Sequence, residues 1–365
     1  MRIISPFLKR VVYPALSAAG VFRRASAPGL AIVTYHGVIP SGYQPIDVSL
    51  DGNLLSAESL RCQLRRLKTH YNVVSPEDVL GWRRGGKLPE RAVLITCDDG
   101  LLNCLTDMLP VLQEEKVGCL FFVTGASARE SRTILWYEEL FLLLLHAPDG
   151  PLEVSDAGTV IRGVLASGEQ RRKLWRDSVK RLLLLDAVGR GSFLEAFRDH
   201  VGIVMLPDLG DHSSVSCRRY GMMTRPEVRQ LAAAGMSIGA HTMSHLVLSQ
   251  MPADAAYAEI IQSRTRLEAA LERPVWAFAY PFGDPQSVTA DVMRMPRKAG
   301  FEAAFLNHGG GLGSGLPGFA LPRIHVSSEM SLAELEAHVS GFYARLKRHA
   351  RRDVLSVEMM QDAAQ

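Results

Sequence analysis

The sequence predicts an α/β barrel that is interrupted by a helical insertion. Short apolar segments alternate with amphipathic ones on either side of residues 129–217, a rhythm typical of parallel strands joined by helices. Two of these apolar segments are followed directly by aspartates or histidines, and barrel enzymes place their chemistry at the carboxyl ends of their strands. We therefore expect one barrel domain over residues 30–348, with an insertion at 129–217.

Residues 1–29 are expected to lie at the periphery of the fold. Lys9 and Arg10 precede a short apolar stretch, as in a signal peptide, but Pro14 interrupts that stretch and two arginines precede the small-residue site, which argues against cleavage. No apolar run approaches the roughly 20 residues that span a bilayer. We expect a cytoplasmic protein, with a membrane-associated interfacial segment as the alternative and secretion as the less favoured outcome.

The barrel is expected to begin with a strand over Leu30–Tyr35, which is almost entirely apolar. Ser56 is a suitable N-cap for a helix over Ala57–His70, in which leucines recur at helical spacing. A short strand at 73–74 and a helix over Pro76–Arg83 follow. None of these segments after the first strand carries evident chemistry.

The next part of the chain reads as a βαβ unit. It consists of a buried strand over Val93–Thr96, a helix over Leu101–Glu115 and a second buried strand over Cys119–Val123. Asp98 and Asp99 lie where the first strand ends. Adjacent carboxylates leave the backbone in different directions, so one can bind a metal while the other acts as a base. The alternative is an Asp-Asp-Gly turn that only starts the helix.

The insertion is expected to form three helices with apolar faces, over residues 134–147, 171–185 and 191–203. Their leucine runs leave three interpretations open: a core packed on the barrel, a surface that binds a partner, or a patch that faces a membrane. The core is the favoured interpretation.

A second polar motif follows the insertion. His241 and His245 come directly after an apolar strand over Met236–Ala240. Two histidines four residues apart can reach a common point, and with Asp99 they give three ligands and leave a position open, as catalytic zinc sites require. Such a pair can also arise by coincidence on a surface, but here both motifs lie at strand ends.

The other elements of this half continue the alternation of helices and strands. Thr224 and Glu227 form a capping box at the start of one helix, and Pro296 should shorten or bend a later one. The loop 308–318 is rich in glycine but opens no helix, so it is expected to be a flexible rim instead of a phosphate cradle. The predicted elements are helices to Ala234, over Ala253–Glu272 and over Gln286–Lys298, strands over Val275–Tyr280, Phe301–Leu306 and Leu321–Val326, a closing helix from Leu332 to Leu346, and an exposed or disordered tail over 349–365.

At three motifs the chain resembles the polysaccharide deacetylase family, whose catalytic domain is NodB-like. The family's T-F-D-D-G motif has its counterpart in Thr96–Gly100, and its H-[ST]-x-x-H motif in His241–His245. A Pro-aromatic-Gly turn is present in Tyr280–Gly283. The resemblance covers Ala31 to Val326 apart from the insertion, and three ordered motifs at strand ends are a specific signal. A similar helical insertion occurs in relatives linked to bacterial exopolysaccharide production.

The resemblance implies a distorted (β/α) barrel and a metal-dependent hydrolase. Its substrate would be an N-acetylated sugar of a polysaccharide, an oligosaccharide or a lipid-linked glycan. Asp99, His241 and His245 would bind a divalent metal, for which zinc is the first choice, while cobalt, nickel and iron also suit two imidazoles and a carboxylate. Asp98 would take a proton from the attacking water, whose pKa zinc lowers to roughly 7.

The resemblance also implies roles for two further groups of residues. In the Tyr280-Pro281-Phe282 turn, which would bind substrate, the backbone N–H of Phe282 would stabilise the tetrahedral oxyanion together with the metal. His36 ends the first strand and is the favoured proton donor to the leaving amine, with His325 as its competitor. A histidine at a strand end can also be purely structural.

Two positions depart from the family pattern. Ala279 replaces an arginine that usually orients the base; Arg323 is the candidate substitute, and a surface arginine is the alternative for that residue. Cys97 replaces a phenylalanine, but strand alternation directs it away from Asp98. These departures keep two other functions open: a catalytically retired domain that binds a glycan or a partner, and a hydrolase of another non-peptide amide.

Composition excludes several classes. The chain is 47% hydrophobic and 22% charged, as in ordinary soluble proteins. A net charge of +3 is too mild to indicate nucleic acid, although basic residues near both termini leave contact with an anionic membrane surface open. The five cysteines are odd in number and lack C-x-x-C spacing. They suggest a reducing compartment and neither a disulfide framework nor a thiolate zinc site.

Overall fold

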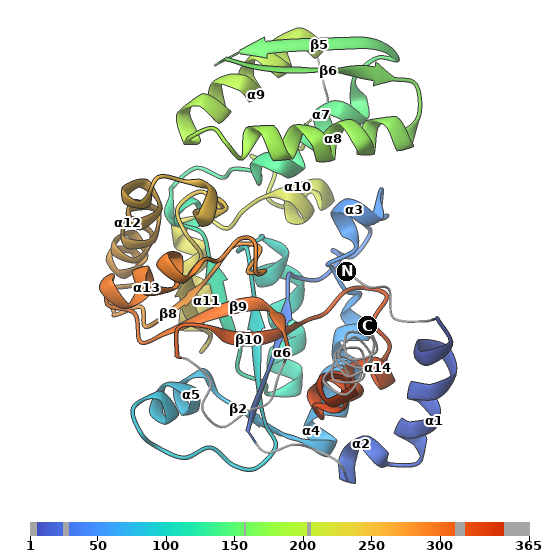
Figure 1. The fold of residues 1–365 in the computed structure, drawn as a ribbon, viewed down its shortest axis with the longest axis vertical. Coiled ribbons are helices and arrows are strands. Elements are labelled where there is room, and N and C mark those ends of the chain that lie inside the picture. The colour runs from blue at the N-terminus through green and yellow to red at the C-terminus, as the bar shows by residue number, and fades with distance from the viewer. Residues whose placement is uncertain (1–5, 25–28, 157, 203–205, 311–317, 347–365) are drawn as a thin grey trace, which may run out of the picture.

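The computed structural model describes residues 6–24, 29–156, 158–202, 206–310 and 318–346. Within these ranges, seven parallel strands close into a barrel because β1 pairs with both β3 and β10 (Figure 1). A further strand, β2 (Asn72–Val74), pairs with the first half of β3. The predicted α/β barrel is thereby confirmed. In order around it the strands are β1 (Leu30–Tyr35), β3 (Ala92–Cys97), β4 (Leu120–Val123), β7 (Ser237–Ala240), β8 (Ala277–Ala279), β9 (Ala303–Gly309) and β10 (Leu321–His325).

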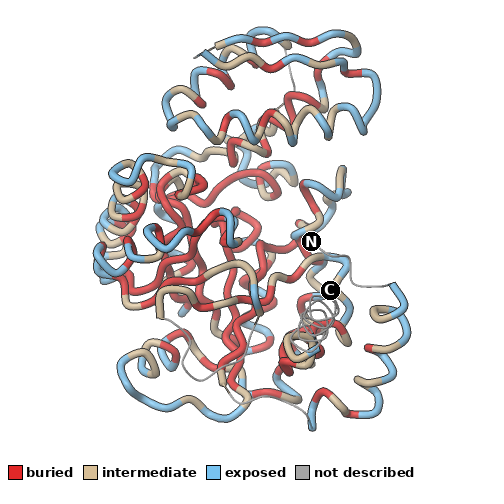
Figure 2. The backbone as a smooth tube through the Cα atoms, in the orientation of Figure 1, coloured by how far each residue is buried: buried red, intermediate tan, exposed pale blue. Residues whose placement is uncertain are grey.

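Strand alternation sorts the barrel's side chains into two cores. In β3, Leu94 belongs to the cluster inside the barrel, whereas Val93 and Ile95 belong to the cluster under the helices. Cys97 lies in the outer cluster, as predicted. Figure 2 shows that the buried residues concentrate in the barrel. The inward row of β3 leads to Asp98, so the alternation that builds the core also directs this carboxylate into the barrel mouth.

Helices surround the barrel where the periodicity places them. The Ser56 hydroxyl caps α4 by accepting the N–H of Ser59, and Thr224 and Glu227 form the predicted capping box of α11. The predicted helix over 101–115 is shorter and begins as a π-helix, η2 (Cys104–Met108), because Pro110 has no N–H to continue the α-helical pattern. The surrounding helices are α4 (Ala57–His70), α5 (Pro76–Arg83), α6 (Leu109–Glu115), α11 (Arg225–Ala233), α12 (Ala253–Leu271), α13 (Ala290–Lys298) and α14 (Leu332–Val339).

The insertion forms a lobe above the barrel (Figure 1). It is not wholly helical, which corrects the sequence prediction, because residues 150–156 and 159–165 form the two strands of an antiparallel hairpin. In the hairpin Leu152 and Val154 are buried while the intervening Glu153 is exposed, a period of two that favours a strand. Leu140, Leu143, Leu144 and Leu182 are buried in a core of the lobe's own. These leucines therefore form a core, as favoured, but the core lies within the lobe, whereas the expected core was packed on the barrel. The lobe consists of α7 (Trp136–His146), β5 (Gly150–Asp156), β6 (Thr159–Leu165), α8 (Gly168–Leu182) and α9 (Ala187–Val201), and α10 (Val215–Tyr220) leads back to the barrel.

A buried ion triad joins the lobe to the barrel. Arg219 at the end of α10 contacts Asp51 at 2.7 Å and Glu138 of α7 at 3.0 Å. Asp51 ends the short helix α3 (Val48–Asp51) beside the barrel. All three side chains are buried. Since a charge left unpaired in such a place costs several kcal/mol, about 3–5, the triad fixes α7 against the barrel.

The N-terminal segment lies at the periphery, packed against α14. It contains η1 (Leu8–Val12), α1 (Tyr13–Ala18) and α2 (Val21–Arg24), and it buries two of its aromatic side chains against Ala337. No helix among the described residues is long and apolar enough to cross a membrane. The predicted tail and most of the glycine-rich rim lie outside the described residues.

Candidate metal centre and catalytic base

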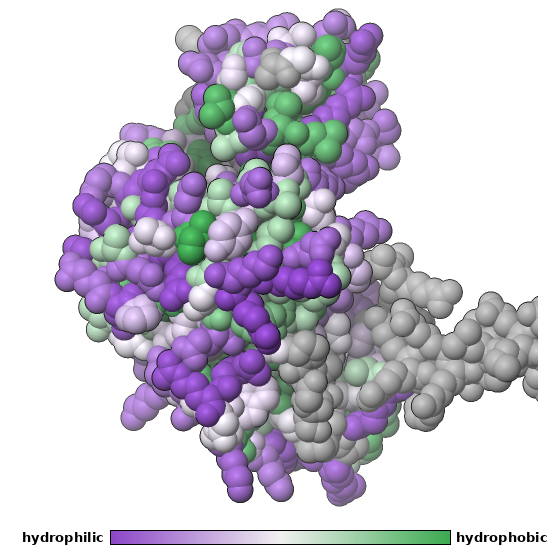
Figure 3. Space-filling model, turned by 60° about the vertical axis from the view of Figure 1, so that its left-hand side comes forward, coloured by the Kyte–Doolittle hydropathy of each residue, from purple (hydrophilic) through white to green (hydrophobic). Residues whose placement is uncertain are grey.

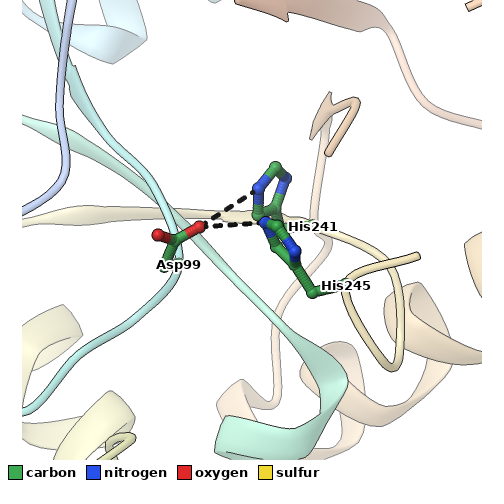
Figure 4. A group of neighbouring side chains, drawn as sticks. All are labelled: Asp99, His241 and His245. Carbon is green, nitrogen blue, oxygen red and sulfur yellow. Dashed lines mark ion pairs between the residues drawn. The ribbon is translucent and has the colours of Figure 1, made fainter. Parts of the chain in front are cut away.

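Three predicted ligands converge at the carboxyl ends of β3 and β7. Asp99 Oδ1 lies 3.2 Å from His245 Nε2 and 3.5 Å from His241 Nε2, and ligand atoms of all three lie within 4.8 Å of one another. Figure 4 shows the carboxylate facing both imidazoles. All three side chains are buried. The structure thus brings together residues that are more than 140 positions apart in the sequence.

The backbone at these residues is held in an uncommon conformation. Asp99, Thr242 and His245 have φ values of 76°, 62° and 53°, in the left-handed region that non-glycine residues rarely occupy. Around the histidines this conformation is fixed by side chains, because Thr242 Oγ1 accepts the N–H of His245 at 3.0 Å. A Glu259 carboxylate oxygen accepts the N–H groups of residues 243 and 244, each at 2.9 Å. Glu259 therefore orients the loop, a role that the sequence analysis did not anticipate.

The donor set fits a divalent metal. His241 Nδ1 donates to the carbonyl oxygen of Ala279 at 2.8 Å, which leaves Nε2 as the free electron-pair donor on the side of Asp99. Burial raises the pKa of Asp99, but the neighbouring histidines outweigh burial and hold the pKa well below its usual value. Two imidazole nitrogens and an ionised carboxylate are suitable ligands for zinc and related cations. His245 Nδ1 has no hydrogen-bond partner within the described ranges.

The neighbouring carboxylate, Asp98, has a different environment. Arg323 donates from Nη1 to Oδ1 at 2.7 Å and from Nη2 to Oδ2 at 2.6 Å, so the pair is bidentate. Arg323 is only 1% exposed, which excludes the alternative that it is a surface arginine. Burial raises the pKa of Asp98, but the charge and hydrogen bonds of Arg323, together with the nearby His241 and His36, outweigh burial and lower the pKa below its usual value. The arrangement keeps Asp98 ionised and fixes its orientation.

Strand geometry explains how Arg323 reaches Asp98. Ala279 of β8 and Leu321 of β10 both belong to the cluster inside the barrel, and Arg323 follows on the same face of β10. Its guanidinium lies over the ring of Phe122 at 5.1 Å, and its Nε donates to the carbonyl oxygen of Leu306 at 2.7 Å. The arginine missing at Ala279 thus has a counterpart on another strand.

The two candidate proton donors lie side by side, with ring centroids 4.9 Å apart. His325 Nε2 lies 3.2 Å from Asn53 Oδ1, and its Nδ1 lies 3.5 Å from the Asn307 amide. His36 has no hydrogen-bond partner among the described residues, and its Nδ1 is buried. Burial lowers the pKa of both rings, that of His325 to about 3. The imidazole that keeps its nitrogens available for a substrate is therefore His36.

The turn after β8 was expected to bind substrate through Tyr280, Pro281 and Phe282, and only part of it is placed to do so. Phe282 has φ 61° and its ring lies 5.1 Å from that of His245. Its backbone N–H has no acceptor within the described residues, and Pro281 beside it is buried. Tyr280, in contrast, is 1% exposed and donates its hydroxyl to the carbonyl of Phe319 at 2.9 Å. Its side chain points into the outer core, because neighbouring residues of a strand point to opposite faces and Ala279 points into the barrel. The prediction that Tyr280 contacts the substrate is therefore wrong for its side chain.

The lobe contributes a residue that the sequence analysis missed. The ring of Tyr137 in α7 lies 5.5 Å from the ring of His245, and Tyr137 is only partly buried. The signal available in the sequence was the adjacent aromatic pair that begins α7. The insertion is therefore part of the wall of the site.

Comparisons with known proteins agree with this geometry. Residues 212–304 match the family model described as polysaccharide deacetylase. The solved structure of the deacetylase PplD of Streptococcus pyogenes in complex with acetate superposes with a TM-score of 0.53 at 15% identity, covering 86% of this chain and 99% of that one. For IcaB from Ammonifex degensii the TM-score is 0.52 at 18% identity, covering 86% of this chain and 98% of that one. No curated protein matches this chain.

At these identities the structural similarity defines the fold, and the family match covers the segment that carries His241, His245 and the Tyr280–Gly283 turn. The resemblance inferred from the three motifs is confirmed. The chain thus has the barrel fold of these solved deacetylases, and its residues 212–304 are similar to the polysaccharide deacetylase family.

Proposed function

We propose that this protein is a metal-dependent hydrolase that removes the N-acetyl group from an acetamido sugar of a polysaccharide, an oligosaccharide or a lipid-linked glycan. The observation that carries the proposal is the bidentate pair of Asp98 and Arg323 beside the cluster of Asp99 and two histidines. One carboxylate is positioned and ionised, and the other is combined with imidazoles. Hydrolysis of an amide by a metal-dependent enzyme requires these two roles, a general base and a metal ligand.

In this proposal Asp99, His241 and His245 hold the metal, with zinc as the first choice. A bound divalent cation supplies Lewis-acid chemistry, which favours ionisation of water and polarises an amide carbonyl. Because the backbone of the ligand loop is fixed by Thr242 and Glu259, the protein presents these ligands already oriented.

The protein's own groups then carry the proton transfers. Asp98 accepts a proton from the water that attacks the acetyl carbon, and Arg323 keeps its carboxylate ionised and oriented toward the barrel mouth. The backbone N–H of Phe282 donates to the oxyanion that forms on the carbonyl oxygen. When the carbon–nitrogen bond breaks, His36 in its protonated form delivers a proton to the nitrogen, so that acetate and a free amino sugar leave.

A catalytically retired binding domain is the second candidate. Ala279 lacks the arginine that would favour hydrolysis over mere binding, but Arg323 supplies a guanidinium to Asp98 from another strand. A third candidate is hydrolysis of a different non-peptide amide. It would use the same residues, and only the substrate would differ.

Acetate release tests the proposal. We expect zinc-loaded protein to release acetate from N-acetylglucosamine oligomers or from a lipid-linked acetamido sugar, and Asp98→Asn to lower kcat/KM about 100- to 10,000-fold, the range for loss of a general base. Bound metal should stay stoichiometric in this variant. Stoichiometric metal without acetate from any acetamido sugar would favour another amide, whereas neither metal nor acetate would favour the retired domain.

A further inference from the structure

A cavity of about 640 Å³ lies between the lobe and the barrel. Its wall contains residues of α7 and α9 from the lobe and the barrel loop that carries His245. Because His245 is a proposed metal ligand, the cavity adjoins the site where the acetamide would react. Its volume is that of a site for a ligand of moderate size, and the proposed reaction leaves it without an occupant. The inference drawn from it rests on the proposed function.

Most of the cavity wall is apolar. Leu135 and Trp136 at the start of α7, Leu194 of α9, and Met222 and Met243 from the barrel side all line it. Figure 3 shows hydrophobic residues on the lobe and where the lobe meets the barrel. A sugar chain exposes hydroxyl groups that need hydrogen-bond partners, and an apolar wall cannot supply them. The wall therefore fits a hydrocarbon better than a further stretch of polysaccharide.

The polar part of the wall is mainly basic, with four arginines and one glutamate. Two of these arginines are already neutralised. Arg132 contacts Glu227 at 2.8 Å, and Arg198 donates to Glu139 at 2.6 Å. These pairs contribute no free positive charge to a ligand.

Arg190 of α9 is different. It is 2% exposed, and its Nη1 donates only to the carbonyl oxygens of Leu182 and Leu185, at 3.3 and 3.1 Å. The guanidinium lies over the ring of Trp136 at 4.9 Å. No carboxylate of the described residues lies within ion-pair distance of it, nor of Arg129, which lines the same cavity and is exposed.

A buried guanidinium without a counter-ion is unfavourable unless a ligand supplies one. Burial lowers the pKa of Arg190 to about 10 in spite of the acidic residues Glu259 and Asp186 nearby. Arginine is also the residue best suited to phosphate, because its planar group donates two parallel hydrogen bonds.

We propose that this cavity binds the phosphate and the adjoining hydrocarbon of a lipid-linked acetamido sugar, with Arg190 and Arg129 contacting the phosphate. The sugar then lies toward His245 and the hydrocarbon along the apolar wall. The substrate class of the proposed deacetylation is accordingly a sugar joined through phosphate to an apolar carrier.

Three probes that share one sugar test this proposal: methyl N-acetylglucosaminide, N-acetylglucosamine 1-phosphate, and the decyl phosphodiester of N-acetylglucosamine. Dissociation constants are measured by calorimetry on the full chain, and acetate release is measured on the same protein. The wild type should prefer the decyl phosphodiester over the methyl glycoside in both measurements, with the simple phosphate in between.

Arg190→Gln and Arg129→Gln should each reduce that preference, expressed as a ratio of affinities, about 10- to 100-fold, as expected for loss of a hydrogen bond between charged groups. Arg129→Gln is included because the exposed Arg129 can be replaced without disturbing a core. Arg176→Gln is the matched control, since Arg176 is an exposed arginine of α8 that does not line the cavity. It should leave the ratio unchanged.

The two proposals fail in different ways. Equal affinity for the three probes, or a preference that survives both arginine substitutions, overturns the lipid-phosphate assignment even if acetate is released. A better affinity for uncharged N-acetylglucosamine oligomers than for the decyl phosphodiester overturns it in favour of a polysaccharide. Arginine-dependent affinity for the decyl phosphodiester without acetate release supports the cavity assignment while contradicting the proposed reaction.

Discussion

The barrel and the lobe each bury an arginine, and the two arginines have opposite surroundings. Arg323 in the barrel mouth makes two short hydrogen bonds to Asp98, whereas Arg190 in the lobe donates to backbone carbonyls alone. A paired buried charge positions its partner, while an unpaired one is suited to a charge brought by a ligand. The barrel therefore presents its buried arginine already paired with a carboxylate, whereas the lobe presents one whose charge has no carboxylate partner among the described residues.

The largest effect should come from removing a ligand on the barrel side of this comparison. In His241→Ala, bound metal measured by elemental analysis should fall below stoichiometry and acetate release should fall below detection, because two ligands do not make a catalytic site. Chelation of the wild-type protein should have the same effect, and added zinc should restore the wild type but not the variant. Full activity of the chelated protein would contradict metal dependence.

The next largest effect should be the loss of stability on breaking the ion triad that joins the lobe to the barrel. Arg219→Met leaves Asp51 and Glu138 buried without their cation, so the free energy of unfolding in urea should fall by about 3–5 kcal/mol. Replacing Arg198, whose side chain is 43% exposed in its pair with Glu139, should cost about 1 kcal/mol or less. Equal losses in the two variants would show that the triad does not join lobe and barrel.

A smaller loss of stability is expected from a substitution in the lobe's own core. Leu143→Ala removes a fully buried side chain of the lobe cluster and should lower the free energy of unfolding by about 2–4 kcal/mol. Leu184→Ala, at a position 72% exposed, should change it by less than about 0.5 kcal/mol. If both substitutions had the same small effect, the leucines would belong to a surface and not to a core.

The most specific test concerns the positioning of the base. Arg323→Met should lower kcat about 10- to 100-fold, the value of charge-assisted hydrogen bonds to Asp98, while KM and metal content stay close to those of the wild type. Arg323→Lys should recover part of the activity, since lysine restores the charge without the bidentate geometry. A rise in KM with unchanged kcat would instead make Arg323 a substrate-binding residue.

Much of the barrel could be predicted from local pattern. The strand over Leu30–Tyr35 and the helices over Ala57–His70 and Pro76–Arg83 were predicted with the bounds that the structure shows, because apolar periodicity and capping residues act within a few positions. The hairpin of β5 and β6 was not predicted, although Leu152, Glu153 and Val154 alternate as in a strand, because it lies between two longer segments whose apolar residues have helical spacing. The direction of Tyr280 also followed from strand parity and was overlooked.

By itself the sequence determined which residue types stand at the strand ends: Asp98 and Asp99 after one strand, His241 and His245 after another. Only the tertiary structure decided that Arg323, from the last strand, reaches Asp98, and that Arg190 of the lobe has no carboxylate partner among the described residues. Local pattern is set by neighbours in the chain, which the sequence displays. Pairing of buried charges is set by barrel closure and by the packing of the lobe. Barrel closure brings together Asp98 and Arg323, which are 225 positions apart.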